Sequence, residues 1–365
     1  MARKRKKKFS KGLTVFLAIL FFFMGAAGGF YGYYRYTLPT DTDTYISGDL
    51  SITFLELGNK YTGDCTYIKI GNTDVLIDAG SKTSSVSTID NYLKEYVTDG
   101  TLEYVIVTHA HQDHYAGFAT NEDADSIFDL YECEMIIDFS QITASKADEK
   151  MYNNYLRERS AEIDAGATHL TAAECIEQGK DKFDLGGGVE LQILDSYYYY
   201  NVAHTENDHS VCVMINQGDR HFLFTGDLER EGEEKLVEMN DLPEVDVYKA
   251  GHHGSKTSSN SVLLEVIKPD IVCICCCAGS TEYKANPENR FPTQDFVDRI
   301  APYTDKVYVT TLCLDFDEDR FESMNGNIKV ISGKGDIIIE CSNNNTILKE
   351  TAWFRQERTC PASWK

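Results

Sequence analysis

Short apolar runs recur along most of the chain, and each is bounded by glycine, aspartate, asparagine or another turn-forming residue. Such runs are typical of strands buried in a sheet, whereas apolar positions three or four residues apart predict helices. The expected strands lie at 51–57, 65–70, 74–78, 104–108, 189–194, 211–215, 221–225, 245–249, 271–276 and 307–311. The expected helices lie near 86–97, 228–239, 258–267 and 293–301. This order favours an α/β domain built as a two-sheet sandwich.

Two later parts of the chain depart from this alternation. Residues 119–185 are interpreted as an insertion, with a strand at 135–139 and polar helical segments at 146–165 and 171–179. Apolar runs at 327–331 and 336–340 predict a last hairpin. Residues 342–365 are polar and show no apolar periodicity, so a disordered C-terminal tail is expected there.

The N-terminus predicts a membrane anchor. Seven of the first eleven residues are Arg or Lys, and residues 12–34 carry no charge. About 20 apolar residues span a bilayer, and a basic cluster before them stays in the cytoplasm. A cleaved signal peptide is the alternative, although its apolar region is usually only about 7 to 15 residues long. We expect a basic cytoplasmic segment at 1–11, a single-pass transmembrane helix at 12–34 and a tether at 35–49, with the folded domain outside the cytoplasm.

The remaining chain is strongly acidic. The whole protein has a formal net charge of −23, and without the seven N-terminal bases it has 28 basic and 58 acidic residues, or −30. A body of this charge repels a polyanion at long range, which disfavours a general nucleic-acid binder. A nuclease is still possible, because bound metal cations neutralise phosphate locally.

The largest group of potential metal ligands directly follows the apolar run 104–107. His109, His111, Asp113 and His114 lie within six residues. Imidazole nitrogens suit zinc, and carboxylate oxygens suit zinc or a harder ion such as manganese. This mixed set therefore indicates a pair of divalent cations, and a merely solvated polar loop is the less favoured interpretation.

Further candidate ligands lie where later strands begin or end. His209 precedes the run 211–215, Asp227 follows 221–225, and His252 and His253 follow 245–249. An α/β fold collects its functional groups at strand ends. We therefore expect these side chains near the first motif.

In this order the motifs resemble those of the metallo-β-lactamase fold superfamily, in particular the extracytoplasmic hydrolase domain of ComEC-type competence proteins and phosphorylcholine esterases. The resemblance covers about residues 50–341 and includes Asp78 after a strand and the Gly63-Asp64-Cys65 turn. It implies a four-layer αββα sandwich. The fold by itself is much less specific for the substrate.

The resemblance also implies a binuclear centre. One metal would be held by His109, His111 and His209, and the other by Asp113, His114 and one of the pair His252 and His253. Asp227 would bridge both metals, and Asp78 would support a ligand from behind. Two departures from the family are visible: many competence-type members have asparagine or another residue in place of His209, and Arg290-Phe291-Pro292 stands where the family often has a His-Pro pair.

Several side chains are candidates for the reaction itself. Two cations lower the pKa of a bridging water and neutralise charge on the attacked group, which makes Asp113, Asp227 and His253 candidate catalytic residues. The histidine of the pair that binds no metal would be free to donate a proton to the leaving group. Candidate substrate contacts are Ser255, Lys256 and, within the aromatic run 197–200, Tyr199; the alternative for that run is a half-buried aromatic loop.

The expected function is that of a membrane-anchored, extracytoplasmic hydrolase. It would use two zinc or manganese ions to cleave phosphodiester or related ester bonds in a small or cell-wall-linked substrate. A competence-type DNA nuclease is the second hypothesis, and a catalytically silent binding module is the third. The eleven cysteines form no obvious disulfide framework. Those in the run 273–277 lie in a predicted buried strand, so we interpret them as small hydrophobic side chains rather than as a metal-thiolate cluster.

Overall fold

The structure is a computed structural model that describes residues 49–119, 124–283 and 286–365. The expected cytoplasmic segment, the expected transmembrane helix and nearly all of the expected tether lie outside the described residues. In the part of the chain that is described, no helix combines the length and apolar character needed to cross a bilayer.

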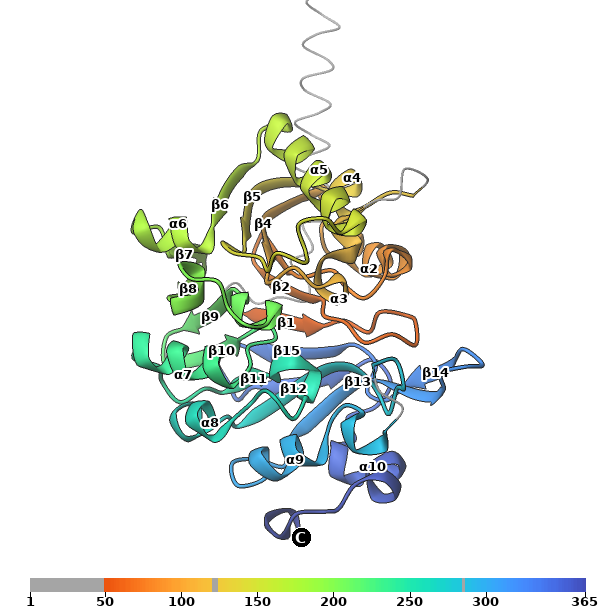
Figure 1. The fold of residues 1–365 in the computed structure, drawn as a ribbon. Helices are drawn as coiled ribbons and strands as arrows, with labels where there is room; N and C mark the ends of the chain where they lie inside the picture. Colours follow the sequence, from red (N-terminus) through yellow and green to blue (C-terminus); the bar gives the residue numbers. More distant parts are fainter. Residues whose placement is uncertain (1–48, 120–123, 284–285) are drawn as a thin grey trace, which may run out of the picture. The chain divides into compact units, whose positions relative to one another are not determined.

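Two eight-stranded sheets form the framework of the domain (Figure 1). The first sheet has the spatial order β16 (Ile338–Cys341), β15 (Ile328–Ser332), β1 (Leu50–Phe54), β2 (Thr66–Ile70), β3 (Thr73–Ile77), β4 (Thr101–Val107), β5 (Glu132–Asp138) and β6 (Thr168–Thr171). Strands β3 to β6 run parallel to one another. Their carboxyl ends therefore lie along one edge of this sheet.

The second sheet has the same number of strands and a similar parallel part. Its order is β14 (Arg320–Ser323), β13 (Val307–Asp315), β12 (Ile271–Ala278), β11 (Val247–Lys249), β10 (Arg220–Phe224), β9 (Cys212–Gln217), β8 (Val189–Leu194) and β7 (Lys182–Gly186). Strands β10 to β13 are parallel. The predicted ligands that follow β10 and β11 therefore leave this sheet on the same side.

The main core joins the two sheets. Apolar side chains of β1 and β4 belong to the same buried cluster as those of β9, β10 and β12, and the rings of Phe54 and Phe224 lie 6.1 Å apart across the interface. Helices of the first sheet's outer layer also contribute to this core; they are α2 (Val86–Leu93), α4 (Ile127–Leu130), α5 (Lys150–Ala165) and α6 (Ala172–Glu177). Burial from both sides explains why the central strands are almost continuously apolar.

A second buried cluster covers the other face of the second sheet. It is formed with α7 (Arg230–Met239), α8 (Ser261–Ile267), α9 (Gln294–Ile300) and α10 (Ala352–Glu357). Figure 1 shows α7, α8 and α9 along this sheet and α2, α4 and α5 beside the first one. The predicted α/β two-sheet sandwich is therefore confirmed within the described residues.

The segment 119–185 contains the expected elements: the strand near 135–139 is β5, and the helices near 146–165 and 171–179 are α5 and α6. Its strands β5 and β6 extend the first sheet. The structure corrects the expectation for the C-terminal segment, which is ordered: it forms α10 and two short 3₁₀ turns, and Leu348, Phe354 and Trp364 are buried in the second cluster. These three residues have no regular spacing, so periodicity could not reveal that they pack.

Candidate metal centre

The first motif leaves β4 and turns directly into a short helix. His109 is completely buried just after β4, and His111 occupies the N-cap position of α3 (Gln112–Tyr115). Asp113 and His114 lie in the first turn of that helix. The change from extended to helical backbone after His111 lets four polar side chains from one short segment point in different directions.

Backbone contacts fix this turn against two neighbouring segments. The amide of Asp64 donates to the carbonyl oxygen of Asp113 (3.0 Å), the amide of Ala79 donates to that of His114 (2.7 Å), and the amide of Gly80 donates to that of Asp64 (2.8 Å). A Cβ atom at Gly80 would lie only 1.5 Å from the Asp113 carbonyl oxygen. Glycine is required there because the two backbones approach so closely.

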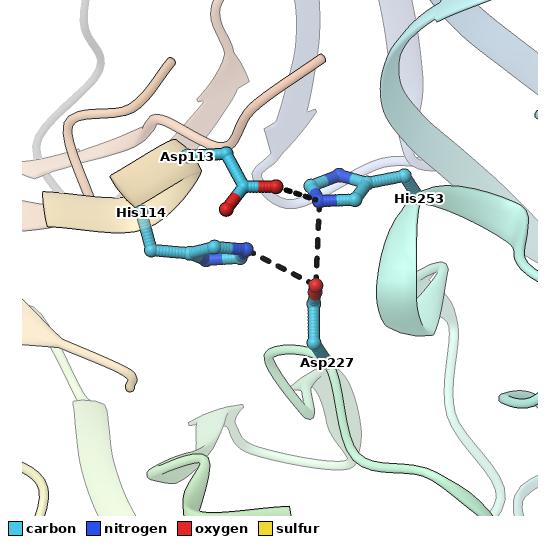
Figure 2. A group of neighbouring side chains, drawn as sticks. All are labelled: Asp113, His114, Asp227 and His253. Atoms are coloured by element: carbon cyan, nitrogen blue, oxygen red, sulfur yellow. Dashed lines mark ion pairs between the residues drawn. The ribbon is translucent and has the colours of Figure 1, made fainter. Parts of the chain in front are cut away.

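Asp113, His114, Asp227 and His253 converge on one point (Figure 2). His114 Nε2 lies 3.2 Å from Asp227 Oδ2, His253 Nε2 lies 3.3 Å from the same oxygen, and His253 Nε2 lies 3.4 Å from Asp113 Oδ2. Two ligands about 2.0–2.1 Å from a tetrahedral zinc ion lie roughly 3.3–3.4 Å apart. The spacing of this cluster therefore matches the ligands of a single ion.

Acceptor groups behind the two imidazoles fix their orientation. Asp78 Oδ2 lies 2.7 Å from His114 Nδ1. His253 Nδ1 lies 2.9 Å from the Cys275 carbonyl oxygen and 3.2 Å from Asp64 Oδ1. With Nδ1 engaged, each Nε2 faces the cluster, an arrangement typical of metal-binding histidines. Asp78, which also accepts hydrogen bonds from the Thr108 amide (2.8 Å) and hydroxyl (2.7 Å), thus has the supporting position expected for it, and the Cys275 carbonyl oxygen has the equivalent position behind His253.

Unsatisfied atoms at the centre support the same interpretation. Among the described residues, His114 Nε2, His253 Nε2 and Asp227 Oδ1 are buried without a hydrogen-bond partner. Buried polar atoms are normally satisfied, so such a concentration requires an explanation. A divalent cation bound by these nitrogen and oxygen donors provides one, and the donor set fits zinc or manganese.

The electrostatics of the cluster also favour a cation. Burial alone would raise the pKa of Asp227, but the imidazoles of His114 and His253 outweigh burial and hold this pKa well below its usual range. Burial alone would lower the pKa of His114, but the carboxylates of Asp227 and Asp78 raise it well above its usual range. The acidic side chains thus hold a proton on the imidazole, which a metal ion would have to displace.

A buried lysine lies beside these carboxylates. Lys249, the last residue of β11, is 3% exposed, and its ammonium forms an ion pair with Asp64. Its Nζ also lies 3.9 Å from Asp227 Oδ1 and 3.5 Å from the Gly226 carbonyl oxygen. This fixed cation offsets part of the negative charge of the site. Sequence reasoning missed Lys249, although a lysine within an apolar strand was a visible signal.

The expected ligands of the other metal are only partly brought together. His109 Nε2 and His111 Nδ1 lie 3.0 Å apart, and the His109 ring lies 4.2 Å from that of His114. Burial lowers the pKa of His109 well below its usual range, so its imidazole is neutral and able to coordinate a metal. These two histidines form a candidate half-site next to the four-residue cluster.

The ligand role expected for His209 is not supported by its position. Its Nε2 accepts a hydrogen bond from the Ala203 amide (2.9 Å), and its Nδ1 lies 3.3 Å from Glu206 Oε1. His209 ends the 3₁₀ turn η4 (Glu206–His209). From the same turn, Asn207 Nδ2 lies 3.4 Å from His252 Nδ1. Both ring nitrogens of His209 thus have partners outside the four-residue cluster, whereas Asn207 contacts a histidine beside it.

His253 is the member of the histidine pair that joins the cluster. His252 Nε2 lies farther from Asp227 Oδ2, at 4.0 Å, while its Nδ1 lies 3.1 Å from the Thr257 hydroxyl and 3.5 Å from Glu229 Oε1. Its side chain is 21% exposed, whereas that of His253 is fully buried. Both residues have left-handed backbone angles (φ 46° and 55°), a strained conformation that is characteristic of functional sites.

The structure gives little support to the expected substrate contacts. Tyr199 is 1% exposed and its hydroxyl accepts a hydrogen bond from the Cys212 amide (2.8 Å), so it supports the chain before β9 and is inaccessible to substrate. Ser255 is buried and Lys256 is exposed. The amides of Ser259 and Asn260, just before α8, both donate to Glu233.

One further residue at the site was not foreseen. The hydroxyl of Tyr283 donates to Asp113 Oδ2 at 2.7 Å, and the side chain is 49% exposed. Tyr283 follows β12 in a polar segment that shows no apolar periodicity. The sequence therefore carried no signal for its position.

Comparisons with known proteins agree with this geometry. A family model described as the metallo-beta-lactamase superfamily matches residues 58–124 and 143–278, more than half of the chain. Recombination protein 2 of Haemophilus influenzae is 30% identical over 146 residues, which are 39% of this chain and 17% of that protein. ComE operon protein 3 of Bacillus subtilis is 25% identical over 173 residues, which are 46% of this chain and 19% of that protein.

This chain therefore spans less than a fifth of the length of these two curated relatives. Among solved structures, the metallo-beta-lactamase fold protein YhfI from Bacillus subtilis is 11% identical with a TM-score of 0.41, over 73% of this chain and 96% of that chain. The family model covers the strands and turns that carry Asp113, His114, Asp227 and His253. The chain belongs to the metallo-β-lactamase superfamily.

Proposed function

We propose that the domain is a binuclear metal-dependent hydrolase of phosphodiester or related ester bonds. The observation that carries this proposal is the convergence of Asp113, His114, Asp227 and His253 with unsatisfied nitrogen and oxygen atoms between them. These four residues would hold one ion. His109 and His111 would hold the second together with Asp227, whose Oδ1 has no hydrogen-bond partner and makes it the candidate shared ligand.

Bound cations would act as Lewis acids on the scissile group and lower the pKa of water at the site. The protein's own groups would then orient the reactants. Asp78 and the Cys275 carbonyl oxygen keep the rings of His114 and His253 in place, and Lys249 limits the repulsion among the buried carboxylates. His252 is partly exposed beside the cluster and is held at Nδ1, so its Nε2 is the candidate proton donor to the leaving group.

The substrate proposal rests on charge. An acidic body repels long polyanions, whereas a compact phosphoester carries few charges and fits between two cations. We therefore favour a small or cell-wall-linked phosphodiester, cleaved outside the cytoplasm by a protein anchored through residues 12–34. The names of three relatives refer to recombination, to the ComE operon and to competence, and a competence-related DNA nuclease is therefore our second candidate.

Asp227→Asn provides the test. The substitution keeps the shape of the side chain but removes the charge shared by the proposed ions, so metal content and turnover should fall together. The full chain and the variant are loaded with zinc or manganese, metal is measured by elemental analysis, and hydrolysis is followed on a phosphodiester, a phosphorylcholine ester, single-stranded DNA, a lactone and a β-lactam.

Glu238→Gln serves as the matched control, because Glu238 is an exposed partner of Lys235 on α7. It should leave metal content and turnover unchanged. Absence of stoichiometric metal in the unmodified protein would refute the metal centre. Bound metal without turnover on any of these substrates would favour the binding-module hypothesis instead.

A further inference from the structure

The loop that follows β12 is anchored next to the metal cluster. Its base is closed by the Gly279 amide, which donates to the Phe291 carbonyl oxygen (2.8 Å). Glu282 accepts a hydrogen bond from the Thr62 amide (2.9 Å) and pairs with Lys82 (3.4 Å), and its side chain is only 10% exposed. The position of the next residue, Tyr283, is therefore set by contacts that lie outside the cluster.

Tyr283 reaches from solvent to a candidate metal ligand. Its hydroxyl donates to Asp113 Oδ2, the same oxygen that lies 3.4 Å from His253 Nε2. The side chain is nevertheless 49% exposed. One end of the ring is thus fixed at the reaction centre, while the rest of the ring remains accessible.

Phe291 continues this aromatic surface. Its ring centroid lies 5.9 Å from Tyr283, 5.9 Å from His253 and 5.7 Å from His252. The backbone on either side is held by Arg358, which donates to the carbonyl oxygens of Arg290 (2.7 Å) and Pro292 (2.9 Å). The C-terminal segment therefore helps to fix a ring directly against the candidate proton donor and the candidate ligand.

We infer that Tyr283 and Phe291 form an aromatic subsite for a planar, apolar substituent of the ester. The inference deepens the proposed hydrolase function and rests on it. An ester whose reacting group lies at Asp113 and His253 would bring its substituents within reach of these two rings, because Tyr283 contacts Asp113 and Phe291 contacts His253. Both rings are held by contacts at their edges or backbone, so little conformational entropy is lost when a substituent packs on them.

Binding measurements separate this subsite from the rest of the site. The full chain loaded with zinc is titrated by calorimetry with phenyl phosphate and with inorganic phosphate, which share the anionic group and differ in the ring. Tyr283→Ala and Phe291→Ala should weaken phenyl phosphate binding roughly 2- to 12-fold, as expected for one aromatic contact, and change phosphate binding less than about twofold. Tyr283→Phe keeps the ring and should retain the preference for phenyl phosphate.

One measurement and three further variants make the result specific. Zinc content identifies the variants that still bind metal. Phe291→Leu replaces Phe291→Ala if the alanine variant does not fold, because leucine keeps apolar volume but has no flat aromatic face. Tyr96→Phe removes a hydroxyl far along the chain, on the segment after α2. Ile338→Ala removes an exposed apolar side chain from the edge strand β16. Both of the last two should bind phenyl phosphate like the unmodified protein.

The outcomes also distinguish this inference from the proposed function. Equal weakening of both ligands in the ring variants, or no preference for phenyl phosphate in the unmodified protein, would overturn the subsite even if bis(p-nitrophenyl) phosphate is hydrolysed. A preference that is lost with either ring, in a protein that hydrolyses none of the five substrates tested for the proposed function, would support the subsite and refute the hydrolase.

Discussion

At the scale of single residues, each important side chain of the site is positioned by a contact with a neighbouring polar group. Asp78 orients His114, the Cys275 carbonyl oxygen orients His253, and Lys249 pairs with Asp64. The motif spacing could predict that histidines and aspartates converge, because ligands cluster at strand ends. It could not predict which of His252 and His253 is the ligand, since this depends on two consecutive left-handed backbone conformations.

Lys249 allows this dependence to be tested. Lys249→Met keeps the apolar stem of the side chain but leaves Asp64 buried without its cation, which typically costs about 3–5 kcal/mol of stability. Urea unfolding of the metal-free protein in EDTA should show this loss. Lys306→Met removes an exposed lysine paired with Asp270 and should cost no more than about 1 kcal/mol. Equal losses in the two variants would contradict a special role for Lys249.

At the scale of elements, a buried carboxylate connects α7 with the segment before α8. Glu233 on α7 accepts hydrogen bonds from the amide and side chain of Asn260 (both 2.8 Å) and from the Ser259 amide. This contact fixes the chain after the His252-His253 turn. The helix α8 begins at Ser261 rather than at 258 because Ser259 has a left-handed backbone conformation (φ 56°), which a right-handed helix cannot include.

This carboxylate gives stability a specific pH dependence. Burial raises the pKa of Glu233 from its ordinary value of 4.5 to about 8. Unfolding therefore releases a proton between about pH 4.5 and 8, and the contribution of Glu233 to stability falls as the pH rises through this window. Glu233→Gln cannot release that proton.

The measurement compares urea unfolding of both proteins in EDTA at pH 5.5 and pH 8. The unmodified protein should lose stability relative to Glu233→Gln at the higher pH. If the two proteins change in parallel, Glu233 is already ionised at pH 5.5 and the raised pKa is wrong.

The C-terminal elements show where sequence reasoning stops. Strands could be predicted because each is a continuous apolar run. The segment 342–365 has only isolated apolar residues, and these pack into a core that is formed largely by helices distant in sequence. Trp364 is 5% exposed, and its indole nitrogen donates to the Thr304 carbonyl oxygen (2.8 Å). Such long-range packing is invisible to local periodicity.

Trp364→Ala should therefore destabilise the domain by about 3–5 kcal/mol, the usual effect of removing a buried large aromatic side chain. Thermal unfolding followed by circular dichroism would detect this loss. Arg355→Ala changes an exposed residue of α10 and should have little effect. An unchanged melting temperature for Trp364→Ala would restore the expectation of a disordered tail.

At the scale of the whole molecule, net charge and local charge act on substrates in opposite directions. The chain outside the N-terminal bases carries −30, yet the candidate site collects histidines and would bind cations. A small ester is affected mainly by the local site, whereas a long polyanion also experiences the field of the acidic body. The fold and the family therefore do not identify the substrate, whereas the charge distribution favours a small ester over a long polyanion.

Salt dependence separates these candidates. We expect a small phosphodiester to be cleaved faster than single-stranded DNA at equal phosphate concentration. Raising the salt concentration shortens the screening length, from about 10 Å at 0.1 M to about 3 Å at 1 M, and should accelerate DNA cleavage by reducing repulsion. The small substrate provides the control, because its rate should change much less. DNA cleavage that is faster at low salt and slows as salt rises would instead require a basic contact surface, and the competence-type nuclease would replace the small-ester hydrolase as the better hypothesis.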